Sequence, residues 1–196
     1  ILNNLLYFYD DHECTRFLVR RSFQTALGLG FPKSTHEDII FTCYALAVAS
    51  HVQIVSEDLY RLNRRHISLM TYMTTERVYG YVDAVRNILL NWDTFSAVLP
   101  NESLSRSRMI TQAIGVTLYQ IATKTPENAS RVQLLECLRS AIADEDEIWE
   151  ALCDSADNPN SSNFEKGVQE FVECYGPYGK YQPEQLDLSL RTIFSD

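Results

Sequence analysis

The fold is decided by residues 107–123, Ser-Arg-Met-Ile-Thr-Gln-Ala-Ile-Gly-Val-Thr-Leu-Tyr-Gln-Ile-Ala-Thr. The only charged residue in this stretch is Arg108, and its apolar residues fall nearly all round a helix. A helix that is hydrophobic on every side belongs in the middle of a domain. The stretch therefore predicts a buried central helix, with other helices packed around it.

The spacing of proline and glycine favours long helices in the rest of the chain. No proline lies between Pro32 and Pro100, and Gly80 is the only glycine between them. Apolar periodicity and capping residues predict helices over 11–29, from 34 or 35 through 62, over 74–92 and 94–99, from 128 or 130 to 142, and over 164–175. A further helical turn with Ile148, Trp149 and Leu152 is expected after the acidic run 144–147. We expect one all-α domain over residues 1–196, with seven or eight helices around the central one.

Composition limits the possible partners. The chain has 196 residues, 45% of them hydrophobic, which suffices for one buried core. Its formal net charge of -9 argues against nucleic acid or an anionic membrane as the main partner, although a local basic patch could persist within that balance. The longest uncharged stretch, Ile39–Ser56, is shorter and more polar than a membrane span, so we expect a buried helix there and a soluble chain.

The residues that carry chemistry do not form a catalytic or metal-binding pattern. Five cysteines without a C-x-x-C pair indicate free intracellular thiols rather than a secreted disulfide framework. The four histidines lack zinc spacing, and no phosphate loop or nucleophile elbow occurs. The acidic run 144–147 is interpreted as a solvated helix start. We therefore expect a binding protein rather than an enzyme, with no cofactor, no metal and no catalytic residue.

The last third of the chain resembles a known family. Gly167-Val-Gln-Glu-Phe-Val-Glu-Cys-Tyr-Gly-Pro177 is similar to the second homology region of the Bcl-2 family of apoptosis regulators. Leu188-Ser-Leu-Arg-Thr192 resembles the segment that leads into that family's C-terminal membrane tail. The resemblance implies a Bcl-2-like helical bundle, and that a membrane tail would follow Asp196.

A stretch near residue 50 resembles the family's third homology region, which has four apolar residues on one helical face, then a small residue and an acid. The candidates are Val48, Val52, Val55 and Leu59, with Ser56 as the small residue and Glu57 as the acid. The run Asn63-Arg-Arg-His-Ile67 resembles the Tyr-Arg-Arg-x-Phe of pro-survival members. An ordinary amphipathic core helix is the alternative interpretation.

Two further stretches resemble the family's first and fourth homology regions. Ser105-Arg-Ser-Arg108 stands where the family has Asn-Trp-Gly-Arg, and only the arginine is kept. Residues 15–31 resemble the fourth region, as any amphipathic helix would. Trp149 could correspond to the tryptophan that opens the second region, with residues 156–163 as an insertion.

The resemblance implies a hydrophobic surface groove that accepts the amphipathic helix of a pro-apoptotic relative. Carried over by position, its lining consists of Leu59, Asn63, Ile67 and Met70 on one wall, Phe95, Val98 and Leu99 on the other, Thr111 on the floor and Tyr175 at one end. Arg108 would meet the acid of the partner helix in a charge-assisted hydrogen bond.

The expected function is that of a pro-survival-like apoptosis regulator. The resemblance implies an intracellular protein, cytoplasmic or at the mitochondrial outer membrane, which meets the membrane only through the tail. Two alternatives stay open: a pro-apoptotic effector of the same fold, as in Bax and Bak, and an unrelated all-helical adaptor or viral scaffold.

Overall fold

A computed structural model describes residues 18–28, 30–31, 33, 36–53, 72–93, 102–156, 162–176, 179 and 182–195. These residues form eight helices and no strand, so the all-α prediction is confirmed for this part of the chain. The helices are α2 (Arg21–Ala26), α3 (Glu37–Val48), α4 (Thr75–Leu90), α6 (Glu102–Lys124), α7 (Asn128–Ala141), α8 (Asp146–Ala156), α9 (Asn163–Tyr175) and α10 (Pro183–Ile193).

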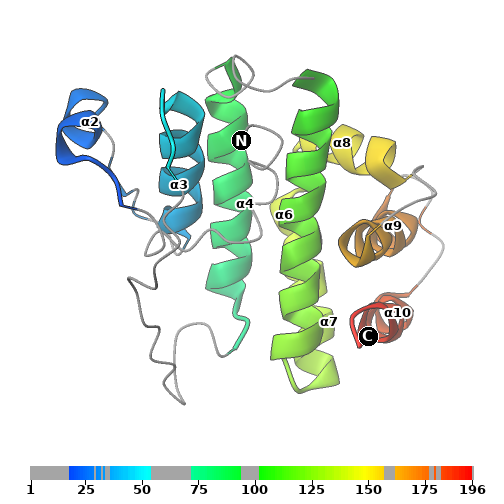
Figure 1. Cartoon of the computed structure of the whole chain (residues 1–196). Coiled ribbons are helices and arrows are strands. Elements are labelled where there is room, and N and C mark those ends of the chain that lie inside the picture. The colour runs from blue at the N-terminus through cyan, green and yellow to red at the C-terminus, as the bar shows by residue number, and fades with distance from the viewer. Residues whose placement is uncertain are drawn as a thin grey trace.

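The predicted central helix is confirmed as α6, the longest of the described helices. It contacts α4, α7, α8, α9 and α10, and Figure 1 shows it between α4 on one side and α9 and α10 on the other. Its apolar residues from Met109 to Ala122 are buried, and Ala113, Ile114, Leu118 and Ile121 are fully so. Burying these side chains is the main favourable contribution to the stability of the bundle.

Two glycines let the C-terminal helices approach closely. A Cβ atom at Gly115 of α6 would lie 2.7 Å from Cβ of Phe164 in α9. A Cβ atom at Gly167 of α9 would lie 2.7 Å from the ring of Phe194, directly after α10. Glycine at 115 therefore sets the spacing of α6 and α9, because a side chain there would meet Cβ and the backbone of Phe164. A side chain at 167 would have to displace the Phe194 ring.

Helix α3 packs on α4 at the other side of the bundle. His36, which precedes α3, is buried and its ring stacks on Tyr81 of α4, with 3.7 Å between the ring centroids. Ile39 is fully buried in the same core. These contacts fix the N-terminal half of α3, and Figure 1 shows α2 farther out, beyond α3.

The predicted extent of α3 is wrong after Val48. Ala49 has extended backbone angles, and residues 50–53 are not helical, whereas the periodicity predicted a helix through residue 62. Val48 and Ala49 are half-buried and Ser50 is exposed. Because short helices depend on tertiary packing, the helix ends where that packing weakens.

Other boundaries also differ from the prediction. Within the described part of the predicted helix 11–29, only Arg21–Ala26 is helical, and the chain turns at Gly28 with a φ of 62°. Helix α6 begins at Glu102, so Ser105–Arg108 lies inside it rather than before it. Helix α10 was not predicted as a helix, and the predicted helix 94–99 lies outside the described residues.

Candidate helix-binding site

Three of the predicted groove residues lie in the described part of the chain: Arg108, Thr111 and Tyr175. The other predicted lining residues lie outside it; they are Leu59, Asn63, Ile67, Met70, Phe95, Val98 and Leu99. The structure therefore describes the part of the site that belongs to α6 and α9. The groove as a whole stays a prediction.

Arg108 differs from the other arginines near it. Its side chain is exposed, and among the described residues it forms no hydrogen bond or ion pair. Arg106, two positions earlier, pairs with Glu147 of α8 and lies over the Trp92 ring at 5.6 Å. Ser107 donates a hydrogen bond to the carbonyl oxygen of Ala151, at 2.8 Å. Helix α8 thus occupies Arg106 and Ser107, whereas the guanidinium of Arg108 has no partner in the part of the chain that the structure describes.

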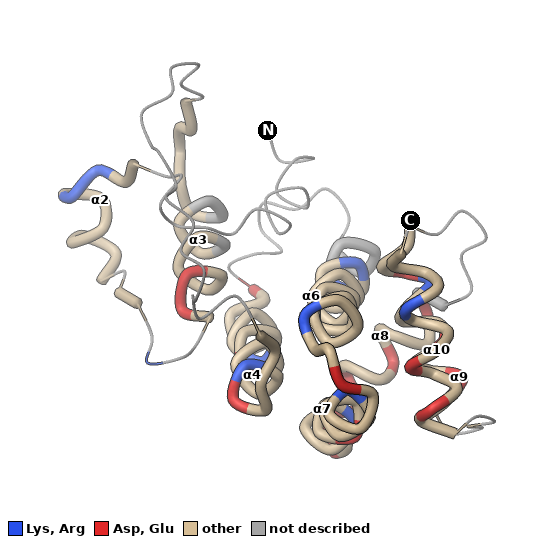
Figure 2. The backbone as a smooth tube through the Cα atoms, turned by 90° about the horizontal axis from the view of Figure 1, so that it is seen from below, with Lys and Arg blue, Asp and Glu red and all other residues tan. Residues whose placement is uncertain are grey.

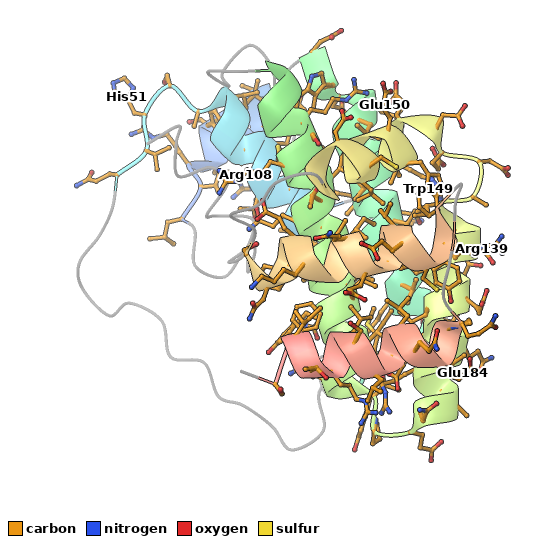
Figure 3. The ribbon with its side chains drawn as sticks, turned by 90° about the vertical axis from the view of Figure 1, so that its right-hand side faces the viewer. His51, Arg108, Arg139, Trp149, Glu150 and Glu184 are labelled. Carbon is orange, nitrogen blue, oxygen red and sulfur yellow. The ribbon has the colours of Figure 1, made fainter. Side chains whose placement is uncertain are left out.

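The position of Arg108 along α6 follows from helical spacing. Arg108, Gly115 and Tyr119 lie seven and four residues apart and so share one face of α6. Gly115 and Tyr119 both contact Phe164 at the start of α9. At about 1.5 Å per residue, Arg108 lies about 10 Å beyond that contact along α6. Figure 3 accordingly shows Arg108 off one end of α9.

Thr111 is buried, with 1% of its surface exposed. Its hydroxyl oxygen has no hydrogen-bond partner among the described atoms. An unsatisfied buried hydroxyl is unfavourable by roughly 1–3 kcal/mol. Thr111 lies one turn after Arg108 and beneath the surface, so a ligand at Arg108 would reach it only if the covering groups moved.

Tyr175 lies at the other end of α9 and is bound to α7. Its hydroxyl donates to Oε1 of Glu136 at 3.1 Å, and the guanidinium of Arg139 lies 5.8 Å from its ring centroid. Burial raises the pKa of the Tyr175 phenol, and the neighbouring Glu136 carboxylate raises it further. Figure 3 shows Arg139 and Arg108 toward opposite ends of α9. Tyr175, beside Arg139, thus lies toward the other end of α9 from Arg108, and its place at one end of a groove stays a prediction.

The segment that resembles the second homology region is part of the core. Gly167, Val168, Phe171 and Cys174 of α9 are buried, and they face α6, α8 and α10. Trp149 of α8 stacks on Phe171, with centroids 5.9 Å apart and planes 13° apart. The apolar residues that carry the resemblance thus pack the end of the bundle.

The candidate third homology region is described only in part. Val48 ends α3, and Val52 is half-buried on non-helical backbone. The helical spacing expected between these two valines is therefore absent, because Ala49–Gln53 is not helical. Val55, Ser56 and Glu57 lie outside the described residues, as Leu59 does.

The described residues offer no metal centre: within the described ranges no group of three or more histidines, cysteines and carboxylates lies close enough to hold an ion. Cys137, Cys153 and Cys174 form no disulfide bond. No helix in the described ranges has both the length and the hydropathy of a membrane span.

One charged surface was missed by the sequence analysis. Arg20, Arg21 and Lys33 are exposed around α2. The signal was present, since residues 15–35 contain four of the 17 basic residues and none of the 26 acidic ones. A net charge calculated over the whole chain conceals such local segregation.

Comparisons with protein-family models, with curated proteins and with solved structures found no match to this chain.

Proposed function

We propose that this protein is a helix-binding regulator that resembles the pro-survival Bcl-2 proteins. In this proposal it accepts the amphipathic helix of a pro-apoptotic relative on a surface that includes Arg108. The observation that carries the proposal is the exposed Arg108 guanidinium, which stands on the buried central helix α6 without an ion-pair partner among the described residues.

The environment of Arg108 suits recognition of an acidic residue. A guanidinium can hold a carboxylate through two parallel hydrogen bonds. Neighbouring Arg106 is already paired with Glu147, so a ligand carboxylate would meet Arg108 without displacing a described ion pair. Buried Met109 and Ile110 fix the helix on which Arg108 stands, so the group is held on a rigid element.

The expected affinity follows from the apolar anchors. Burying four apolar side chains contributes roughly 6–12 kcal/mol before the entropy of association and helix ordering is subtracted. Since about 12 kcal/mol corresponds to a nanomolar dissociation constant, we expect micromolar affinity once these costs are subtracted. An exposed arginine–carboxylate pair contributes about 1 kcal/mol, or about fivefold in affinity. The apolar anchors therefore set affinity, and Arg108 mainly sets register.

Calorimetric titration tests the proposal. The ligands are helical peptides with four apolar anchors followed by a small residue and an aspartate. At least one should bind with micromolar or better affinity, and Arg108→Ala should weaken it about fivefold. Arg20→Ala is the matched control, because Arg20 is also an exposed arginine. Replacing the peptide aspartate by alanine should weaken wild type but not Arg108→Ala.

Two outcomes would contradict the proposal. One is a folded protein that binds none of the peptides. The other is equal affinity of wild type, Arg108→Ala and Arg20→Ala for a peptide that does bind, which would remove Arg108 from the site. Mapping of amide chemical shifts locates the surface that binds the peptide. Shift changes around Arg108 and Thr111 agree with the proposal, whereas changes confined to another face favour an unrelated adaptor.

A further inference from the structure

The basic residues of the N-terminal region are segregated from the acidic ones. Arg16, Arg20, Arg21 and Lys33 fall in residues 15–35, which contain no acid, although the whole chain has a net charge of -9. The first acidic residues after this stretch are Glu37 and Asp38, in the first turn of α3. The rest of the chain is thus still more acidic than the total suggests, and one short stretch is cationic.

The cationic stretch also exposes large apolar side chains. Leu18 is 89% exposed, Leu27 45% and Phe31 50%. No residue of α2 is buried, so this helix contributes nothing to the core. Figures 1 and 2 show α2 at the outer edge of the fold, and Figure 2 shows the blue of its basic residues away from the acidic residues of α8, α9 and α10.

We propose that this segment, with Leu18, Arg20, Arg21, Leu27, Phe31 and Lys33, binds the surface of an anionic lipid membrane. Interfacial anchors combine basic side chains, which meet phosphate and carboxylate headgroups, with apolar ones that enter the boundary of the acyl chains. The described residues between 18 and 33 supply both kinds of side chain, and the sequence has no acid there that would repel the headgroups.

The arrangement of the apolar residues favours lipid over a protein partner. Leu18 precedes α2, Leu27 follows it, and Phe31 is half-exposed beside α3, where it stacks on Phe41. Their sequence positions, 18, 27 and 31, do not follow the i, i+3, i+4, i+7 spacing of the anchors in helix-in-groove recognition. A fluid lipid interface can accept each apolar side chain separately, without a matching groove. At physiological salt, charges more than about 8 Å away are largely screened, so the distant acidic residues do not prevent the contact.

Vesicle flotation with the full chain tests the proposal at physiological salt, about 0.15 M. The protein should float with vesicles of phosphatidylcholine containing 30% phosphatidylserine, and not with phosphatidylcholine alone. Each basic residue near the surface changes partitioning by roughly fivefold, so Arg20→Ala/Arg21→Ala should reduce it about 25-fold. Raising the salt to 0.3 M should also reduce it.

Matched variants separate this segment from the rest of the surface. Leu18→Ser should reduce partitioning, whereas Leu188→Ser, at a leucine 60% exposed on α10, should not. Lys33→Ala should reduce partitioning, whereas Lys166→Ala, at an exposed lysine of α9, should not. All four positions are exposed or nearly so, and thermal melts should confirm that the variants are as stable as wild type.

Three results would overturn the proposal: no flotation with anionic vesicles, equal flotation with neutral vesicles, or wild-type flotation of the Arg20→Ala/Arg21→Ala variant. Sedimentation tests the competing occupant. If the wild-type protein does not bind vesicles but forms a dimer, and Arg20→Ala/Arg21→Ala abolishes that dimer, the segment binds a second copy of the chain instead.

Discussion

Arg131 of α7 and Asp187 of α10 form a buried ion pair. Nε of Arg131 donates to Oδ1 of Asp187 at 2.6 Å, and Nη2 donates to Oδ2 at 3.1 Å. Nη1 of Arg131 donates to the carbonyl oxygens of Thr125 and Pro126, both at 2.8 Å, and Asn128 also donates to Asp187. The arginine and the carboxylate are 6% and 2% exposed. This pair therefore binds the last described helix to the turn between α6 and α7.

Breaking this pair should be strongly destabilising. Asp187→Ala would leave the Arg131 guanidinium buried without its carboxylate, and the free energy of unfolding should fall by about 3–5 kcal/mol. Urea unfolding measures the change. Glu184→Ala, at an exposed residue of the same helix, is the control and should change it by about 0.5 kcal/mol or less.

Removing both charges should be less harmful than removing one. In Arg131→Met/Asp187→Leu no uncompensated buried charge remains, since Arg191, which also pairs with Asp187, is 45% exposed. Stability should therefore recover much of the loss caused by Asp187→Ala. If Asp187→Ala alone is as stable as wild type, the ion pair does not hold α10.

Gly115→Ala should loosen the contact between α6 and α9. The new Cβ would lie 2.7 Å from Cβ of Phe164 and 3.1 Å from its carbonyl oxygen, neither of which can rotate away. Overpacking costs about 1–3 kcal/mol, and the better helix propensity of alanine offsets up to about 1 kcal/mol. We expect a net loss of about 1–2 kcal/mol in thermal or urea unfolding. Gly30→Ala is the control, because the added Cβ would have no atom within 4 Å apart from its neighbours in the chain. Its stability should be unchanged or slightly raised.

The start of α9 depends on Ser162. Its hydroxyl accepts a hydrogen bond from the backbone N–H of Glu165 at 3.4 Å, and the Glu165 carboxylate accepts one from the N–H of Ser162 at 2.7 Å. Ser162→Ala should lower stability by about 1 kcal/mol, and Ser162→Gly by only a few tenths. Equal losses in the two variants, measured by thermal unfolding, would argue against the capping role.

Stability should fall at alkaline pH, in part through Cys174. Burial raises the pKa of its thiol from 9.0 to about 11, and the Glu136 carboxylate contributes. Between about pH 9 and pH 11 the unfolded chain therefore loses this proton while the folded chain keeps it, so the free energy of unfolding decreases with rising pH. The decrease between pH 8 and pH 10.5, measured by urea unfolding, should be smaller in Cys174→Ala. An identical decrease in the variant would show that this thiol does not contribute.

Several helices could be predicted from the sequence because their signals are local. The uncharged stretch 107–123 predicted α6, and apolar periodicity with capping residues predicted α4, α7 and α9. Most of the buried residues of these helices are apolar. A pattern of this kind reports which side of a helix avoids water, and that side does not depend on which neighbour covers it.

The candidate site was only partly accessible to such reasoning. The resemblance singled out Arg108, and the structure places this residue at the surface of α6. It did not indicate that Tyr175 binds Glu136, 39 residues away in sequence, at the far end of α9. Which side chains meet across helices depends on the directions in which the helices cross, and spacing within one helix carries no such information.

The sequence by itself determined that this protein is a helical domain built on one apolar helix, because burial of residues 107–123 requires helices on all sides. Only the tertiary structure decided where α3 ends and that Pro183–Ile193 forms α10. Helix α3 ends at Val48, where its packing weakens, although the apolar spacing continues. Helix α10 is held by Asp187, whose partner lies 56 residues earlier in the chain. Both features depend on contacts that form only after distant segments have come together, so no local window of sequence contains them.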